Sequence, residues 1–305
     1  MGLYTDLALE AREMNPELDG VTEEKESFPD ITITRIAVTN EYAAEKIGKK
    51  MGKYVTLDAP GLIDRPLDLF EELSKKLASE LQKVVDGFPN SESILVVGLG
   101  NRSVTPDSLG PKVVEKVYVT RHVKQYMPDA FRFPVPSVAS AAPGVLGSTG
   151  IETFEIVKGM TDRIKPDLVI AIDSLASRRA SRISTTVQLS DAGIDPGSGV
   201  GNIRRGLNIE SLDVPVIAIG VPLVVYASTI TQDTISMIAD ETGLHGDEDK
   251  LKELAEKVVS ERMDGMIVTP KDIDSIVGDM SGIIADGINM ALYRDHYDDV
   301  RMLIA

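Results

Sequence analysis

The chain has 305 residues and a formal net charge of −16, from 32 basic and 48 acidic residues spread along it, which argues against direct binding to nucleic acid. It contains no cysteine, which excludes disulfides, thiolate catalysis and cysteine-ligated metal. No leader peptide is recognisable and no apolar run approaches membrane-spanning length, so we expect a cytoplasmic protein with no membrane contact.

Apolar runs and amphipathic stretches alternate after an acidic stretch at residues 1–30, which we expect to be a peripheral arm. Strands are predicted at residues 31–38, 54–57, 94–98, 135–139, 168–172, 185–189 and 214–220. Helices are predicted at residues 66–85, from Gly110 onward, and at residues 151–164, 228–239, 248–260 and 271–292. The strands at 94–98 and 168–172 are apolar without alternation, which is typical of parallel strands covered on both faces. We therefore predict a three-layer α/β/α fold with a mostly parallel sheet and helices on both faces.

Two acidic residues follow these two apolar strands. Asp107 lies in the polar loop after the first strand, and Asp173 comes directly after the second. The carboxyl ends of parallel strands meet at one edge of a sheet, so we expect the two side chains to lie in one crevice. Two adjacent carboxyl groups cannot both ionise cheaply, so the pair would share a proton. The ionised group could activate water while the protonated group polarises a carbonyl.

We expect Asp173 to hold the proton, because it follows five apolar residues. Other interpretations stay open. Either acid alone could have a structural role, as a helix cap or a turn anchor. The two together could instead hold a divalent metal. Asp191 is a third acid near a strand end that could join the site.

Glycine-rich stretches give weaker signals. Gly98 and Gly100 suggest a dinucleotide fingerprint, but Ser103 holds the third glycine position, so a tight turn is the better interpretation. The run Gly197, Ser198, Gly199 does not match a nucleophile elbow, and we interpret it as a substrate-binding or flexible loop. The three histidines form no zinc-binding motif, so we expect neither a metal nor another cofactor.

A set of short blocks occurs in a characteristic order along the chain. The blocks are Val96-Val97-Gly98-Leu99-Gly100-Asn101, Ser103-Val104-Thr105-Pro106-Asp107, Leu109-Gly110-Pro111, Thr120-Arg121-His122, Thr149-Gly150-Ile151-Glu152-Thr153, Ile170-Ala171-Ile172-Asp173-Ser174-Leu175-Ala176, Gly193-Ile194-Asp195-Pro196-Gly197-Ser198-Gly199-Val200-Gly201-Asn202 and Val268-Thr269-Pro270-Lys271. Together they resemble the spore germination proteases of endospore-forming bacteria.

The resemblance implies an endopeptidase that degrades small acid-soluble spore proteins during germination, in the cytoplasm of the spore core. It also implies a zymogen that processes its own N-terminus and assembles as a homotetramer. The presumptive aspartic-type catalytic pair of that family matches Asp107 and Asp173. The fold is expected to be similar to that of hydrogenase-maturation endopeptidases, whose carboxylates contact a metal.

The N-terminal residues resemble the cleavage pattern of the same family, which is an acid, an aliphatic residue, alanine, any residue and glutamate. Here the pattern is Asp6-Leu7-Ala8-Leu9-Glu10. It predicts processing between Asp6 and Leu7, with residues 1–6 as a short propeptide-like segment and 7–305 as a single α/β peptidase domain. Two alternatives remain open: a metal-dependent endopeptidase of the hydrogenase-maturation type, and a non-catalytic α/β protein that binds peptides.

Overall fold

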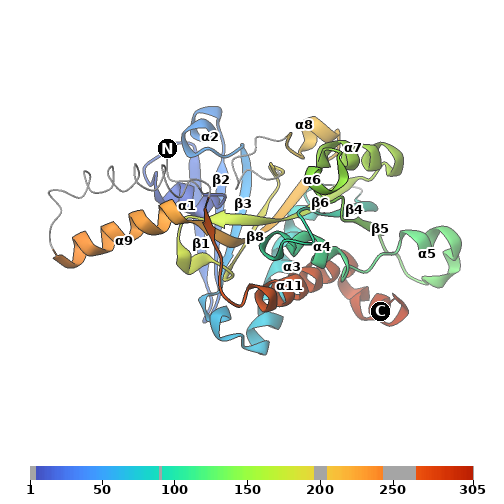
Figure 1. Cartoon of the computed structure of the whole chain (residues 1–305). Helices are drawn as coiled ribbons and strands as arrows, with labels where there is room; N and C mark the ends of the chain where they lie inside the picture. The colour runs from blue at the N-terminus through green and yellow to red at the C-terminus, as the bar shows by residue number, and fades with distance from the viewer. Residues whose placement is uncertain (1–4, 89–90, 196–204, 243–265, 305) are drawn as a thin grey trace.

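The computed structural model describes residues 5–88, 91–195, 205–242 and 266–304. Within these ranges, nine strands form one sheet in the order β1-β2-β3-β7-β8-β6-β4-β5, and β9 pairs with β8. Helices cover both faces of the sheet (Figure 1). The α/β class and the helical layers predicted from the sequence are therefore confirmed. No helix in the described part of the chain has the length and apolarity needed to cross a bilayer.

The sheet is mixed in strand direction. Its strands are β1 (Val21–Ser27), β2 (Thr32–Val38), β3 (Gly52–Asp58), β4 (Ser93–Gly98), β5 (Ser137–Ala141), β6 (Leu168–Ser177), β7 (Thr186–Ser190), β8 (Val216–Tyr226) and β9 (Ile267–Val268). Strands β5, β4, β6 and β8 run parallel to one another, as expected for the apolar runs. The pairs β1–β2, β2–β3, β3–β7, β7–β8 and β8–β9 are antiparallel, so the sheet is mixed rather than mostly parallel as predicted, and its parallel part is confined to one half.

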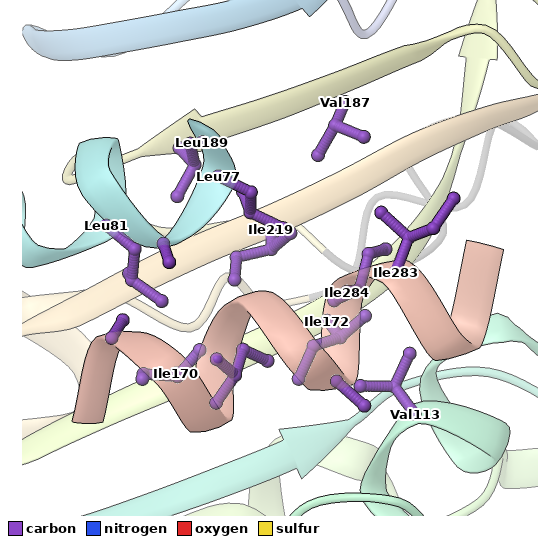
Figure 2. Packing of buried hydrophobic residues seen from close by; sticks show 14 of the residues in the cluster. Leu77, Leu81, Val113, Ile170, Ile172, Val187, Leu189, Ile219, Ile283 and Ile284 are labelled. Carbon is purple, nitrogen blue, oxygen red and sulfur yellow. The ribbon is translucent and has the colours of Figure 1, made fainter. Parts of the chain in front are cut away.

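Two long helices cover one face of the sheet. The longer helices are α3 (Leu67–Val85), α7 (Thr153–Ile164), α9 (Ala227–Thr242) and α11 (Ile273–Tyr293), and the shorter ones are α1 (Ala8–Glu13), α2 (Glu41–Ile47), α4 (Leu109–Val114), α5 (Arg121–Tyr126), α6 (Leu146–Thr149), α8 (Ile209–Leu212) and α12 (Tyr297–Ile304). Helices α3 and α11 pack closely, because Gly287 leaves room for Leu77. Figure 2 shows Leu77 and Ile284 from these helices gathered with Ile172 of β6 and Ile219 of β8 in one core.

The opposite face has two apolar clusters. Helix α7 places Val157 against Val97 of β4 and Val169 of β6. Helices α1 and α2 cover the antiparallel half, where Ala8 and Ala11 are buried. The N-terminal stretch is therefore not wholly peripheral, because α1 supplies small apolar side chains that fill the space between α2 and the sheet.

Strand β1 was not predicted. It pairs with β2 along its whole length, yet every residue after Val21 is exposed. An edge strand of this kind has no buried positions, so it lacks the apolar alternation by which strands are recognised. Arg35 of β2 holds its acidic residues through ion pairs with Glu24 and Glu26. The helix predicted at residues 248–260 lies outside the described residues.

Leu77→Ala should lower the free energy of unfolding by about 3 kcal/mol, because it removes a fully buried side chain from the contact between α3 and α11. Urea titration followed by circular dichroism measures this value. Leu67→Ala, on the same helix but 80% exposed, should change it by less than about 0.5 kcal/mol. Equal losses in the two variants would contradict this account of the core.

Candidate active site

Parallel pairing of β4 with β6 brings the loop that carries Asp107 beside Asp173, although β6 continues to Ser177 and does not end at residue 172 as predicted. Gly98, the last residue of β4, lies opposite Ile172. The pairing continues one residue further, because the Leu99 N–H donates to the Ile172 carbonyl oxygen at 2.8 Å. The chain then leaves the sheet beside Asp173, and the loop that follows carries Asp107.

Asp107 is fixed by a tight turn after β4. It ends a 3₁₀ helix, η2 (Thr105–Asp107), and its Oδ2 accepts from the Asn101 N–H at 2.8 Å. Gly100 has φ +110°, and a Cβ there would overlap the backbone oxygen of Asp107 and lie 2.9 Å from its Oδ1. Gly98 is packed equally closely against Gly110. Gly98 and Gly100 therefore lie in a tight turn, which is the interpretation that the sequence favoured. Gly100 also leaves room for Asp107.

Asp173 lies inside β6 and is only 7% exposed. Burial raises its pKa well above the ordinary aspartate value, and the negative charge of Asp107 raises the pKa further. The Ser174 N–H donates to Asp173 Oδ1 at 2.8 Å, and this hydrogen bond lowers the pKa of Asp173. Burial and the charge of Asp107 thus favour the neutral form of Asp173.

The predicted processing junction lies next to this pair. The Asp6 N–H donates to the Ala176 carbonyl oxygen at 2.9 Å, and the Ala176 N–H donates to Asp6 Oδ2 at 2.7 Å. Leu7 is fully buried. Asp6 is close enough for its charge to contribute to the raised pKa of Asp173. The structure therefore brings Asp6, Asp107 and Asp173 within electrostatic reach of one another.

A cavity of about 550 Å³ adjoins the junction, and Thr5, Asp6, Leu175 and Gly220 are among the residues that line it. Lys49 also lines this cavity, and its Nζ donates to the Thr5 carbonyl oxygen at 2.9 Å. Burial lowers the pKa of Lys49, while neighbouring acids, Asp6 foremost, act in the opposite direction. The sequence does not reveal the role of Lys49, because nothing in a Lys-Lys pair shows which member contacts the N-terminal segment.

Glu10, the last residue of the cleavage pattern, has a buried carboxylate. It accepts from the backbone N–H groups of Arg178 and Arg179 at 2.6 and 2.9 Å, and Arg182 forms an ion pair with it at 3.3 Å. These residues follow β6, so Glu10 anchors α1 to the segment that extends from Asp173. The pattern could have indicated Glu10 as a bound residue, but not its partners.

The other candidates lie elsewhere. Asp191 Oδ1 accepts from the Lys53 N–H at 2.6 Å, so its carboxylate is engaged by the backbone of β3. Strand β7 runs antiparallel to β8. The carboxyl end of β7, which Asp191 follows, therefore points away from the loop that carries Asp107. Gly197, Ser198 and Gly199 lie outside the described residues. Within the described ranges, no group of three or more histidine or acidic side chains is arranged to hold a metal ion.

Comparison with known proteins shows that the chain is a peptidase, because a peptidase family model matches residues 3–252. The chain belongs to that family, the germination proteases, and is therefore an endopeptidase. It is 47% identical to the germination protease of Caldanaerobacter subterraneus subsp. tengcongensis, over 96% of this chain and 94% of the relative. It is 45% identical to the germination protease of Clostridium perfringens, over 94% of this chain and 94% of the relative. It is 38% identical to that of Bacillus cereus, over 95% of this chain and 93% of the relative.

Among solved structures, the chain is similar to the NiFe hydrogenase maturation protease HycI from Thermococcus kodakarensis. The match has 17% sequence identity and a TM-score of 0.30, and it covers 58% of this chain and 96% of that protein.

Gly100→Ala should lower peptidase activity by at least about 10-fold while the chain stays folded, because the added methyl group must displace Asp107. Cleavage assays and circular dichroism on the same samples measure both effects. Gly159→Ala is the matched control, since a Cβ at that position of α7 meets nothing within 4 Å. Full activity of the Gly100→Ala protein would show that the position of Asp107 is not critical.

Asp173→Asn should raise the melting temperature relative to wild type, and the difference should grow from pH 4 to pH 8. Because the folded-state pKa of Asp173 is raised, its contribution to stability is complete below the unfolded-state pKa of about 3.9 and is lost as the pH rises through the folded-state value. Asparagine is neutral throughout and avoids this loss. Thermal melts at pH 4, 6 and 8 test this, with exposed Asp68→Asn as control. A pH-independent difference would contradict a buried, protonated Asp173.

Proposed function

We propose that this endopeptidase degrades small acid-soluble spore proteins at germination and that Asp107 and Asp173 are its catalytic pair. The observation that carries the proposal is the burial of Asp173 inside β6, close to Asp107 beyond the end of β4, with the pKa of Asp173 raised. A carboxyl group that keeps its proton next to a second, more exposed carboxylate is the arrangement required for acid–base hydrolysis of a peptide.

In this mechanism, ionised Asp107 takes a proton from water as the water oxygen bonds to the carbonyl carbon of the substrate. Asp173 donates its proton toward the carbonyl oxygen, which becomes a hydroxyl in the tetrahedral intermediate. Collapse of the intermediate returns that proton to Asp173 and breaks the C–N bond. The leaving nitrogen takes the proton that Asp107 received, so the pair regains its starting state.

We also propose that the protein is made as a zymogen. Residues 1–6 form the segment to be removed, the chain itself cuts between Asp6 and Leu7, and residues 7–305 form the peptidase domain. Support comes from the cleavage pattern and from the position of the junction, which is bound to β6 next to the acidic pair. Assembly as a homotetramer in the cytoplasm of the spore core, without cofactor or membrane, follows from the resemblance to the family.

The first test is intact-mass analysis of a peptide copying residues 1–15 after incubation with the full chain. Wild type should cut between Asp6 and Leu7, and Asp107→Asn and Asp173→Asn should each be slower by roughly 10³-fold, because each removes one half of the acid–base pair. Asp68→Asn, an exposed acid on α3, should behave as wild type. Equal cutting by all four proteins would remove the pair from the mechanism.

A purified small acid-soluble spore protein then replaces the peptide in the same assay, which tests the substrate. We expect it to be cleaved at matching patterns of acid, aliphatic residue and alanine. Cleavage should be unchanged by a chelator, and its loss would favour the metal-dependent alternative.

A further inference from the structure

The junction between Asp6 and Leu7 is held on both sides by one glutamine. Gln188 lies on β7 and is only 8% exposed. Its Nε2 donates to the Asp6 carbonyl oxygen at 3.2 Å, and its Oε1 accepts from the Ala8 N–H at 2.7 Å. The Asp6 carbonyl is the carbonyl of the predicted scissile bond, so this side chain touches a reacting atom.

Strand register places Gln188 in line with Asp173. Asp173 of β6 lies opposite Gly220 of β8, and Gly220 lies opposite Gln188 of β7. Residues paired in this way project from the same face of the sheet, and neighbouring strands are about 4.8 Å apart, so the Asp173 and Gln188 backbones are separated by roughly 10 Å. The middle position of the row is Gly220, and the Leu175 side chain lies over it. Gln188 therefore holds the Asp6 carbonyl over the face of the sheet from which Asp173 projects.

We propose that Gln188 is a further catalytic residue, one that holds and polarises the carbonyl oxygen of the scissile peptide. This inference rests on the proposed function, since it takes Asp6–Leu7 as the bond that is cut. As the water oxygen bonds to the carbonyl carbon, negative charge develops on the carbonyl oxygen, and the Nε2–H group stabilises that charge until the oxygen receives the proton of Asp173. Collapse of the intermediate returns this proton to Asp173 and breaks the C–N bond, and the Leu7 nitrogen leaves with the proton that Asp107 took from water.

Only an amide side chain satisfies both contacts. The Ala8 N–H needs an acceptor and the Asp6 carbonyl oxygen needs a donor, which fixes the orientation of the Gln188 amide. Ala8 stays with the processed chain, so Oε1 remains held after residues 1–6 leave. Nε2 is then directed at the position vacated by the Asp6 oxygen, where the carbonyl of the next substrate binds.

The test compares Gln188→Glu and Gln188→Met in the full chain. Glutamate keeps the acceptor for Ala8 but loses the donor to Asp6, whereas methionine keeps the bulk and loses both. Self-processing is followed by intact mass, and kcat and KM are measured separately on the peptide of residues 1–15. Gln82→Met is the control, because Gln82 is a partly buried glutamine whose Nε2 donates to the Met290 carbonyl oxygen, outside the site.

Both Gln188 variants should lose kcat by roughly 100-fold, the cost of removing an oxyanion donor, with KM changed less than about 3-fold. Self-processing should slow in parallel, and the melting temperature should stay within a few degrees of that of Gln82→Met. A lower melting temperature with unchanged kcat would show that Gln188 only anchors the N-terminal segment, and would overturn the inference. So would a rise in KM alone.

The processing site between Asp6 and Leu7 and the catalytic role of Gln188 can be refuted separately. If wild type cuts the peptide between Asp6 and Leu7 and both Gln188 variants cut it equally fast, the role of Gln188 is refuted and the proposed function stands. If wild type cuts elsewhere or not at all, the proposed processing site is refuted and the inference about Gln188 falls with it.

Discussion

The site depends on placing a carboxyl group where water is scarce. Asp173 occupies a position in β6 that is covered by its neighbours, and an ionised carboxylate there lacks the hydration that it would have in solution. Parallel strands on both sides provide this cover, because β4 and β8 leave β6 no exposed edge. The same pairing determines where the chain leaves β4, so the buried acid and its partner Asp107 are products of one feature of the sheet.

Close backbone packing then sets the geometry of the partner. A side chain at Gly98 or Gly100 would collide with Gly110 or Asp107, so the turn depends on the absence of Cβ atoms as well as on the hydrogen bond from the Asn101 N–H to Asp107. Such a turn has little freedom to adjust. It keeps the Asp107 carboxylate at a fixed place while the side chain stays partly open to solvent, as the proposed proton exchange with water requires.

The sequence predicted those features of the fold and the site that depend on residues close together in the chain. Asp107 and Asp173 each follow a continuous apolar strand, and the parallel half of the sheet was predictable from those strands. The antiparallel half was not, since pairing direction depends on partners far along the chain. Lys49 and Gln188 were missed for a related reason: both form hydrogen bonds to the N-terminal segment, and no neighbour in sequence indicates this contact.

The way the N-terminal segment is bound also determines whether its removal can be reversed. While Asp6 and Leu7 share a peptide bond, the hydrogen bonds of Asp6 to Ala176 form within one molecule, at an effective concentration in the millimolar range or above. If that bond is hydrolysed, the segment before it becomes a separate peptide, and the hydrogen bonds of Asp6 to Ala176 no longer form within one molecule. Dilution then favours its departure, so a single hydrolysis acts as a one-way step that needs no further energy source.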